Sequence, residues 1–181
     1  MGLREAICDG LKAKRHPIYI FGEQGRGKSC AMGCLYVSYK ETPAVPQWLS
    51  LDTFIQQIIK CRTSRDGRCE IPNPTGFGNS IWRSECDWFH IASGCPVLFV
   101  DDIGIKPPTD TGLEIAYKLF NQRLTKDKPT QQMTFLSSNL SPEQLNSIYG
   151  PRIVSRVCRG TVIRCGGEDR RLKNAKYHDL F

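Results

Sequence analysis

Short, almost continuous apolar runs alternate along the chain with longer stretches in which apolar residues recur every three or four positions. The short runs predict strands buried on both faces, whereas the longer spacing is typical of helices with one buried side. We expect strands over 17–21, 45–50, 96–100, 133–139 and 161–165. We expect helices over 3–14, 27–40, 51–60, 81–93, 111–123 and 151–159, and a further helix that opens at Pro142.

Polar residues that favour helix starts mark several of these boundaries. Ser50 can cap the helix that follows it, and Thr111 with Glu114 has the pattern of a capping box. Ser141 and Gln144 have the same pattern, with a proline at the first helical position between them. We therefore expect these helices to begin at the residues that follow their caps.

The order of these elements predicts the architecture. Strands that alternate with helices form a parallel sheet that is covered by helices on both faces. A length of 181 residues is typical of one such domain. The sequence therefore predicts an α/β fold, a three-layer αβα sandwich with a mainly parallel sheet. Residues 62–80 are rich in turn formers and charges, so we expect a long loop there.

Composition excludes several other classes of protein. Hydrophobic residues make up 40% of the chain and charged residues 24%, a globular balance rather than a disordered one. No apolar run approaches the ~20 residues that a membrane span needs. The N-terminal residues 1–16 are too polar for a signal peptide. We therefore expect a cytoplasmic protein that does not act at a membrane.

The nine cysteines fit a reducing compartment. Their number is odd and no pair has the CxxC spacing, so reduced thiols are the expected state. One group could be arranged as a zinc site, although its spacings match no common zinc pattern. That group consists of Cys61, Cys69, Cys86, His90 and Cys95.

The net charge of +7 is unevenly distributed. Residues 151–181 carry eight Lys and Arg against three Asp and Glu, whereas residues 1–150 carry seventeen against fifteen. A basic C-terminal segment favours binding to polyanions because counterions are released. The alternative is an ordinary solvated surface, and charge alone does not separate the two interpretations.

A glycine-rich segment follows the first predicted strand and precedes a predicted helix. It fits the pattern G-x-x-x-x-G-K-S, the Walker A motif, whose glycines let backbone N–H groups surround phosphate oxygens. The lysine would bind the β- and γ-phosphates of ATP, and the serine hydroxyl would bind Mg²⁺. With the cysteine that follows, the predicted nucleotide-binding residues are Gly22, Glu23, Gln24, Gly25, Arg26, Gly27, Lys28, Ser29 and Cys30.

Two acids end the apolar run VLFV. In open α/β sheets, ligands bind at the carboxyl ends of the strands, where these acids would lie. We expect Asp101 to hold Mg²⁺ together with Ser29, and Asp102 to polarise the attacking water. The alternative is that both are ordinary loop acids.

Several further segments carry a resemblance to one family of ATPases. After GEQGRGKS come LFVDDIG, NQR, SSNLSPEQL and YGPRIVSRVCRG. Together they resemble the DnaC/DnaI-type helicase loaders, which are AAA+ ATPases related to DnaA-like initiators and IstB-type transposition helpers. The resemblance implies an AAA+ core without a large lid over 17–172, a short N-terminal segment over 1–16 and a C-terminal tail over 173–181.

The resemblance assigns further site residues. Asn139 matches sensor 1, which contacts the γ-phosphate or the attacking water; the alternative is an asparagine that only satisfies backbone groups. Arg156 matches the arginine finger that one subunit offers to its neighbour's nucleotide, and Arg152 precedes it by one helical turn. The alternative role of both arginines is phosphate binding at the surface or a salt bridge. Arg170 or Arg171 falls near the sensor 2 region.

The chain departs from the family pattern at two points. It has Asp-Asp where most AAA+ proteins have Asp-Glu, and the shorter side chain of Asp102 predicts slow turnover. Only residues 1–16 precede the first strand, whereas loaders of this family carry an N-terminal domain that binds the replicative helicase.

The resemblance implies an ATP-hydrolysing homo-oligomer that acts in DNA replication, with ATP and Mg²⁺ as cofactors. Its partners would be single-stranded DNA and the replicative helicase or another DNA-bound client. Two alternatives stay open: a transposition helper or ATP-gated DNA adaptor with little turnover, and a P-loop small-molecule kinase. The candidate DNA contacts are Arg62, Arg65, Arg68, Lys106, Trp82 and Trp88.

Overall fold

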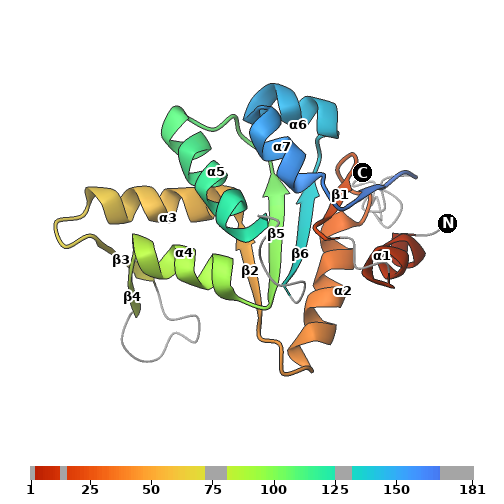
Figure 1. Ribbon diagram of the computed structural model, residues 1–181, viewed down its shortest axis with the longest axis horizontal. Helices are drawn as coiled ribbons and strands as arrows, with labels where there is room; N and C mark the ends of the chain where they lie inside the picture. Colours follow the sequence, from red (N-terminus) through yellow and green to blue (C-terminus); the bar gives the residue numbers. More distant parts are fainter. Residues whose placement is uncertain (1–2, 13–15, 72–80, 125–131, 168–181) are drawn as a thin grey trace, which may run out of the picture.

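The computed structural model describes residues 3–12, 16–71, 81–124 and 132–167 (Figure 1). At its centre lies a five-stranded sheet with the strand order β2-β5-β6-β1-β7. All neighbouring strands in this sheet run parallel, as the alternation of strands and helices predicts. The strands are β1 (Ile18–Phe21), β2 (Pro46–Ser50), β5 (Val97–Ile103), β6 (Met133–Ser138) and β7 (Thr161–Arg164).

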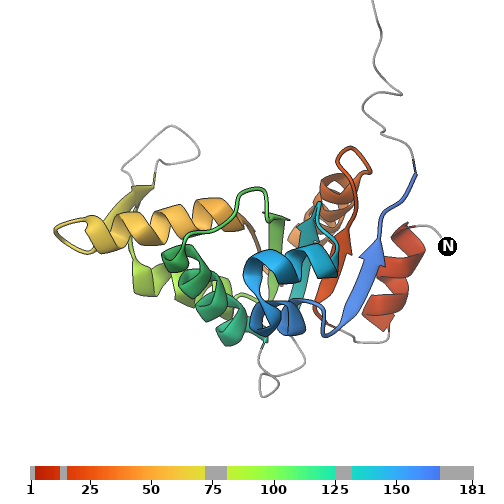
Figure 2. The same cartoon turned by 90° about the horizontal axis from the view of Figure 1, so that it is seen from above.

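Helices cover both faces of the sheet, which confirms the predicted three-layer αβα sandwich (Figures 1 and 2). One face packs against α1 (Leu3–Lys12) and α2 (Lys28–Lys40). The helices on the other face are α3 (Leu51–Thr63), α4 (Glu85–Gly94), α5 (Asp110–Leu124), α6 (Pro142–Tyr149) and α7 (Pro151–Val157).

Alternate residues of the central strands enter two different hydrophobic cores. In β5, Phe99 packs on the α2 side, whereas Leu98 and Val100 pack toward α3 and α5. The ring of Phe99 stacks on Phe135 of β6 and on Trp48 of β2, with ring-centroid distances of 4.7 and 5.5 Å. Burial on both faces explains why these strands are continuously apolar.

The N-terminal helix α1 belongs to the smaller of these cores. Ile7 is 3% exposed and packs with Ile18 and Ile20 of β1. Figure 2 shows α1 beside the edge strand β7. The predicted tail over 173–181 lies outside the described residues.

The region between α3 and α4 differs from the prediction. Helix α3 continues to Thr63, and β3 (Arg68–Ile71) pairs with β4 (Ile81–Ser84) as an antiparallel ribbon. The prediction of a loop throughout 62–80 was therefore wrong, and residues 72–80 lie outside the described part. The helix predicted over 81–93 begins only at Glu85, because Ser84 and Asp87 form a capping box there.

The other helix caps were predicted with mixed success. The capping box of Ser141 and Gln144 is confirmed. Ser50 occupies the N-cap position of α3, but its side chain makes no capping bond. The capping box at Thr111 was wrong, since α5 begins at Asp110 and the Thr109 hydroxyl accepts the Gly112 N–H at 3.2 Å.

The zinc arrangement considered from the sequence is not formed. Within the described ranges, no group of three or more His, Cys, Asp and Glu side chains is placed to hold a metal ion. Cys61 and Cys69 are buried with their sulfur atoms 3.2 Å apart, while Cys86 and His90 are exposed on α4. No helix in the described part of the chain is long and apolar enough to cross a membrane.

Candidate functional site

The polar segments singled out from the sequence meet at one edge of the sheet. Strand β6 lies between β1 and β5, and all three run parallel, so their carboxyl ends lie side by side. The glycine-rich loop leaves β1, the two acids lie in β5, and Asn139 follows β6. This edge is where open α/β sheets bind ligands.

The loop from β1 into α2 has the backbone that anion binding requires. Gly27 at the N-cap has φ 87°, in the left-handed region that glycine adopts without strain. A Cβ atom on Gly22 would lie 2.3 Å from the carbonyl oxygen of Cys165, so only glycine fits there. The N-cap residue Gly27 has no side chain to cap the start of α2, and helix N-termini of this kind favour anions.

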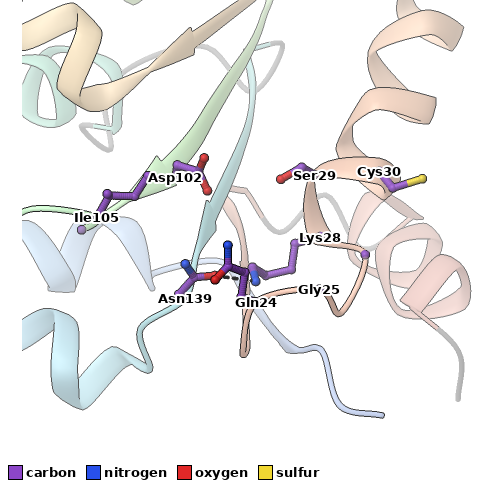
Figure 3. Close-up of a pocket in the computed structure, with 10 residues that line it drawn as sticks. Gln24, Gly25, Lys28, Ser29, Cys30, Asp102, Ile105 and Asn139 are labelled. Atoms are coloured by element: carbon purple, nitrogen blue, oxygen red, sulfur yellow. Dashed lines mark hydrogen bonds between the residues drawn. The ribbon is translucent and has the colours of Figure 1, made fainter. Parts of the chain in front are cut away.

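Lys28 bridges the glycine-rich loop and the end of β6. Lys28 is 5% exposed, and its ammonium donates to the carbonyl oxygens of Gly22 and Glu23 at 2.7 and 2.8 Å. It also donates to Asn139 Oδ1 at 2.7 Å (Figure 3). The residue matched to sensor 1 therefore lies in direct contact with the loop lysine, as expected for adjacent strand ends.

Ser29 and Asp101, the two residues that the sequence analysis expects to hold Mg²⁺, lie in contact. The Ser29 hydroxyl donates to Asp101 Oδ1 at 3.3 Å, and Asp101 is 9% exposed. A hydroxyl and a carboxylate suit Mg²⁺, which usually takes one or two protein ligands and completes its shell with water and phosphate oxygens. The donor set thus fits Mg²⁺ held by Ser29 and Asp101.

Asp102 lies in an unusual backbone conformation. Its φ is 58°, and within the described residues it is the single non-glycine residue with a positive φ. The pairing of β5 with β6 shifts register between Val100 and Ile103, which is the mark of a bulge at the two acids. Asp102 lines the pocket (Figure 3), whereas Asp101 is buried and is not among the lining residues.

A pocket of about 750 Å³ opens over these groups. Its walls contain six of the nine predicted nucleotide-binding residues, and Gly104 and Ile105 are additions that the sequence analysis missed. The lining residues are Gln24, Gly25, Gly27, Lys28, Ser29, Cys30, Asp102, Gly104, Ile105 and Asn139. The other predicted residues, Gly22, Glu23 and Arg26, line a neighbouring pocket of about 580 Å³, where Glu23 and Arg26 form an ion pair.

Contacts with β1 fix the position of Asn139. The buried Tyr19 hydroxyl donates to the carbonyl oxygen of Leu140 at 2.8 Å. Burial raises the pKa of Tyr19, so the hydroxyl keeps its proton at neutral pH. The Gly22 N–H donates to the carbonyl oxygen of Ser138 at 3.3 Å. The loop and the end of β6 are therefore tied together on both sides of Asn139.

Arg156 lies apart from the residues that line this pocket. Its guanidinium donates to Asn121 Oδ1 at 2.9 Å and to the Arg152 carbonyl oxygen, and it lies 5.0 Å from the centre of the Tyr117 ring. The structure thus places Arg156 against α5 of its own chain. Arg170 and Arg171 lie outside the described residues.

The candidate DNA contacts have different surroundings. Arg62 forms ion pairs with Glu85 and Glu114, so its charge is already balanced within the chain. Trp88 packs edge-on against Phe54. Trp82 on β4 is 53% exposed, and Arg65, Arg68 and Lys106 are exposed as well.

The parallel sheet and the helices on both of its faces form an α/β fold of the P-loop NTPase, AAA+ type. Comparison with solved structures agrees. The crystal structure of the DnaC helicase loader superposes with a TM-score of 0.65 at 14% identity, covering 92% of each chain. The DnaI structure gives 0.64 at 15% identity, over 90% of this chain and 84% of that one.

A structure of the replication initiator DnaA bound to AMPPCP and single-stranded DNA superposes with a TM-score of 0.67 at 18% identity. The superposition covers 91% of this chain and 45% of the DnaA chain. The present chain therefore spans just under half of the DnaA length. No model of a known protein family matches the sequence, and no curated protein sequence matches it either. The resemblance to the AAA+ proteins of DNA replication is confirmed at the level of the fold.

Proposed function

We propose that the protein binds and hydrolyses ATP and acts in DNA replication as a helicase-loader-like AAA+ factor. One observation carries this proposal. Lys28, Ser29, Asp102 and Asn139 come from three separate segments and line one pocket, and Asp101 contacts Ser29 beside it. The fold is shared with DnaC over nearly the whole chain. The DnaA structure bound to AMPPCP supports the choice of a nucleoside triphosphate.

In this proposal, each residue has a distinct task. The N–H groups of the glycine-rich loop and the ammonium of Lys28 bind the phosphates, while Ser29 and Asp101 hold Mg²⁺. Mg²⁺ neutralises charge on the phosphate oxygens when it is bound. Asp102 accepts a hydrogen bond from the attacking water, and Asn139 orients that water or the γ-phosphate.

The proposal also includes a second copy of the chain. Arg156 would complete the nucleotide site of a neighbouring subunit, where its charge would stabilise the transferring phosphoryl group. It would first have to leave Asn121 and Tyr117, its partners in the structure described above. The core over 17–172 would then assemble on single-stranded DNA, with the replicative helicase or another DNA-bound protein as its client.

A second candidate is an ATP-gated DNA adaptor or a transposition helper with little turnover. The left-handed backbone of Asp102 favours this candidate, because the conformation suits aspartate better than the longer glutamate of most AAA+ proteins. The carboxylate then stays about one methylene further from the water. An adaptor would bind ATP and change its affinity for DNA without measurable hydrolysis.

The test begins with nucleotide binding. A fluorescent ATP analogue is titrated with Mg²⁺ into the protein and into Lys28→Ala, and hydrolysis is followed with and without single-stranded DNA. The proposal expects binding that weakens at least ~10-fold in Lys28→Ala, since bonds to a charged group contribute about 1.5–3 kcal/mol. Binding with no hydrolysis would favour the adaptor. Phosphate transfer to an added nucleoside would favour a kinase, and absence of nucleotide binding would overturn the proposal.

A further inference from the structure

A buried hydroxyl connects the two acids of β5. Ser137 lies on β6 with 0% exposure, and its Oγ donates to Asp101 Oδ1. A carboxylate can only accept, so the single hydroxyl proton of Ser137 goes to Asp101. The lone pairs of the same hydroxyl accept the Asp102 N–H at 3.2 Å.

These contacts fix the rotamer of Asp101. Its Oδ1 atom accepts from Ser137, from Ser29 Oγ at 3.3 Å and from the Asp102 N–H at 3.1 Å. Ser137 is the fully buried donor of this set, whereas Ser29 faces the pocket. The Ser137 hydroxyl therefore keeps the Asp101 carboxylate oriented toward Ser29, and it would do so even when the Ser29 hydroxyl binds a metal ion instead.

The contact with Asp102 has a separate consequence. The backbone of Asp102 is held at φ 58°, a conformation that non-glycine residues adopt only with local support. The bond from its N–H to Ser137 supplies such support across the bulge between β5 and β6. One side chain thus positions both the expected metal ligand and the expected water-polarising acid.

The next residue provides a natural contrast. Ser138 is also fully buried on β6, but its hydroxyl donates to the carbonyl oxygen of Ile103 and accepts the Leu140 N–H. Neither of its hydroxyl bonds reaches Asp101 or Asp102. The two serines are therefore equally buried, but their hydroxyls bond to different groups.

We propose that Ser137 is a positioning residue that holds Asp101 and the backbone of Asp102 in the geometry for Mg²⁺, so that it sets how strongly Mg²⁺ enhances nucleotide binding. The inference rests on the proposed nucleotide site and adds a residue to it. Groups that orient a metal ligand typically change metal affinity by about 10–100-fold when they are removed.

The test compares Ser137→Ala with Ser138→Ala. The dissociation constant of a fluorescent ATP analogue is measured in EDTA and along a Mg²⁺ titration, and thermal unfolding is followed for each variant. In Ser137→Ala we expect the Mg²⁺ midpoint to rise ~10-fold or more, with the affinity in EDTA unchanged within about two-fold. Ser138→Ala should keep the Mg²⁺ midpoint of the original protein even where its melting temperature falls.

Ser137→Cys is measured in parallel, because a thiol has a similar size but is a weak donor. It should also raise the Mg²⁺ midpoint, and it provides the answer if the alanine variant does not fold. An unchanged midpoint in the folded Ser137 variants, or an equal rise in Ser138→Ala, would overturn the inference while leaving the nucleotide site intact. If the unsubstituted protein binds no nucleotide, both the proposed function and this inference are overturned.

Discussion

The ammonium of Lys28 lies 2.7 Å from Oδ1 of Asn139, so the loop that follows β1 is joined directly to the end of β6. Two backbone carbonyl oxygens of the same loop also accept from this lysine. Phosphate oxygens would have to compete with these acceptors for Lys28. Under the proposed function, Asn139 would have two opposing effects: it would restrain the lysine before a nucleotide binds, and it would contribute to the reaction afterwards.

Asn139→Ala should separate these effects. We expect nucleotide affinity to stay the same or to increase by a few-fold, because one competitor for Lys28 is removed. Hydrolysis should fall ~10-fold or more, since the side chain that orients water or γ-phosphate is lost. Equilibrium binding and single-turnover hydrolysis measure the two quantities. Equal losses of binding in Asn139→Ala and Lys28→Ala would contradict this account.

Substitutions of Asp102 should affect stability and activity differently. Asparagine tolerates the left-handed backbone, so Asp102→Asn should unfold at the same urea concentration while hydrolysis falls by about 10²-fold or more. Asp102→Glu restores the acid of most AAA+ proteins but fits the left-handed backbone less well, and we expect it to lose about 1 kcal/mol of stability. A glutamate variant as stable as the asparagine variant would show that the φ of 58° places no constraint on this position.

Glu85 predicts a pH dependence of stability. Its carboxylate accepts from Arg62 Nε at 2.8 Å and from Lys118 Nζ at 2.9 Å. Hydrogen bonds from Arg62, with a further contribution from Lys118, lower the pKa of Glu85 to about 2. A glutamate in the unfolded chain has a pKa of about 4.3. The stabilisation is therefore complete above about pH 5 and is lost as the pH falls toward 2.

Glu85→Gln should lower the free energy of unfolding by about 1 kcal/mol at pH 7, because the pair is partly exposed. The difference from the original protein should shrink steadily between about pH 5 and 2 in urea denaturation. Glu114→Gln is the matched control, since the Glu114 side chain is 64% exposed and its carboxylate contacts Arg62 at 3.3 Å. A loss in Glu85→Gln that is the same at every pH would rule out the ion pair as its cause.

The two tryptophans near the β3–β4 ribbon should respond differently to replacement. Trp82 is 53% exposed, so Trp82→Ala should leave the melting temperature nearly unchanged. If Trp82 stacks on DNA bases, the same variant should bind single-stranded DNA about 5–100-fold more weakly. Fluorescence anisotropy with a labelled oligonucleotide measures this loss.

Trp88→Ala should instead lower stability by about 3 kcal/mol, because the indole packs on Phe54 and its N–H donates to Cys69 Sγ at 3.3 Å. DNA binding of the folded fraction should be retained. The stacking role is refuted if Trp82→Ala binds the oligonucleotide as tightly as the original protein does.

The position of the site could be predicted from the sequence because it depends on strand order and polarity alone. A glycine-rich loop after one parallel strand and acids at the end of another must share an edge of the sheet. The motifs identified both strands, and Asn139 was placed by resemblance. In the structure Lys28 contacts Asn139, and Ser29 contacts Asp101. The roles assigned to these residues stay predictions.

The features that the sequence did not reveal depend on contacts between distant segments. The β3–β4 ribbon requires the pairing of Arg68–Ile71 with Ile81–Ser84, and such pairing leaves little local signal in four-residue strands. The role of Ser137 arises from its alignment with the acids of β5 rather than from its neighbours in the chain. The docking of Arg156 on Tyr117 and Asn121 likewise depends on how α7 packs on α5.

The most direct test of the account is ATP hydrolysis per mole of protein across a protein-concentration series, with and without single-stranded DNA. The series is repeated with Arg156→Ala and with Arg159→Ala, which removes an exposed arginine close by in the chain. We predict specific activity that rises with concentration, persists in Arg159→Ala, and falls ~10³-fold or more in Arg156→Ala. Specific activity that stays constant with concentration and does not change in Arg156→Ala would contradict the claim that one subunit completes its neighbour's site.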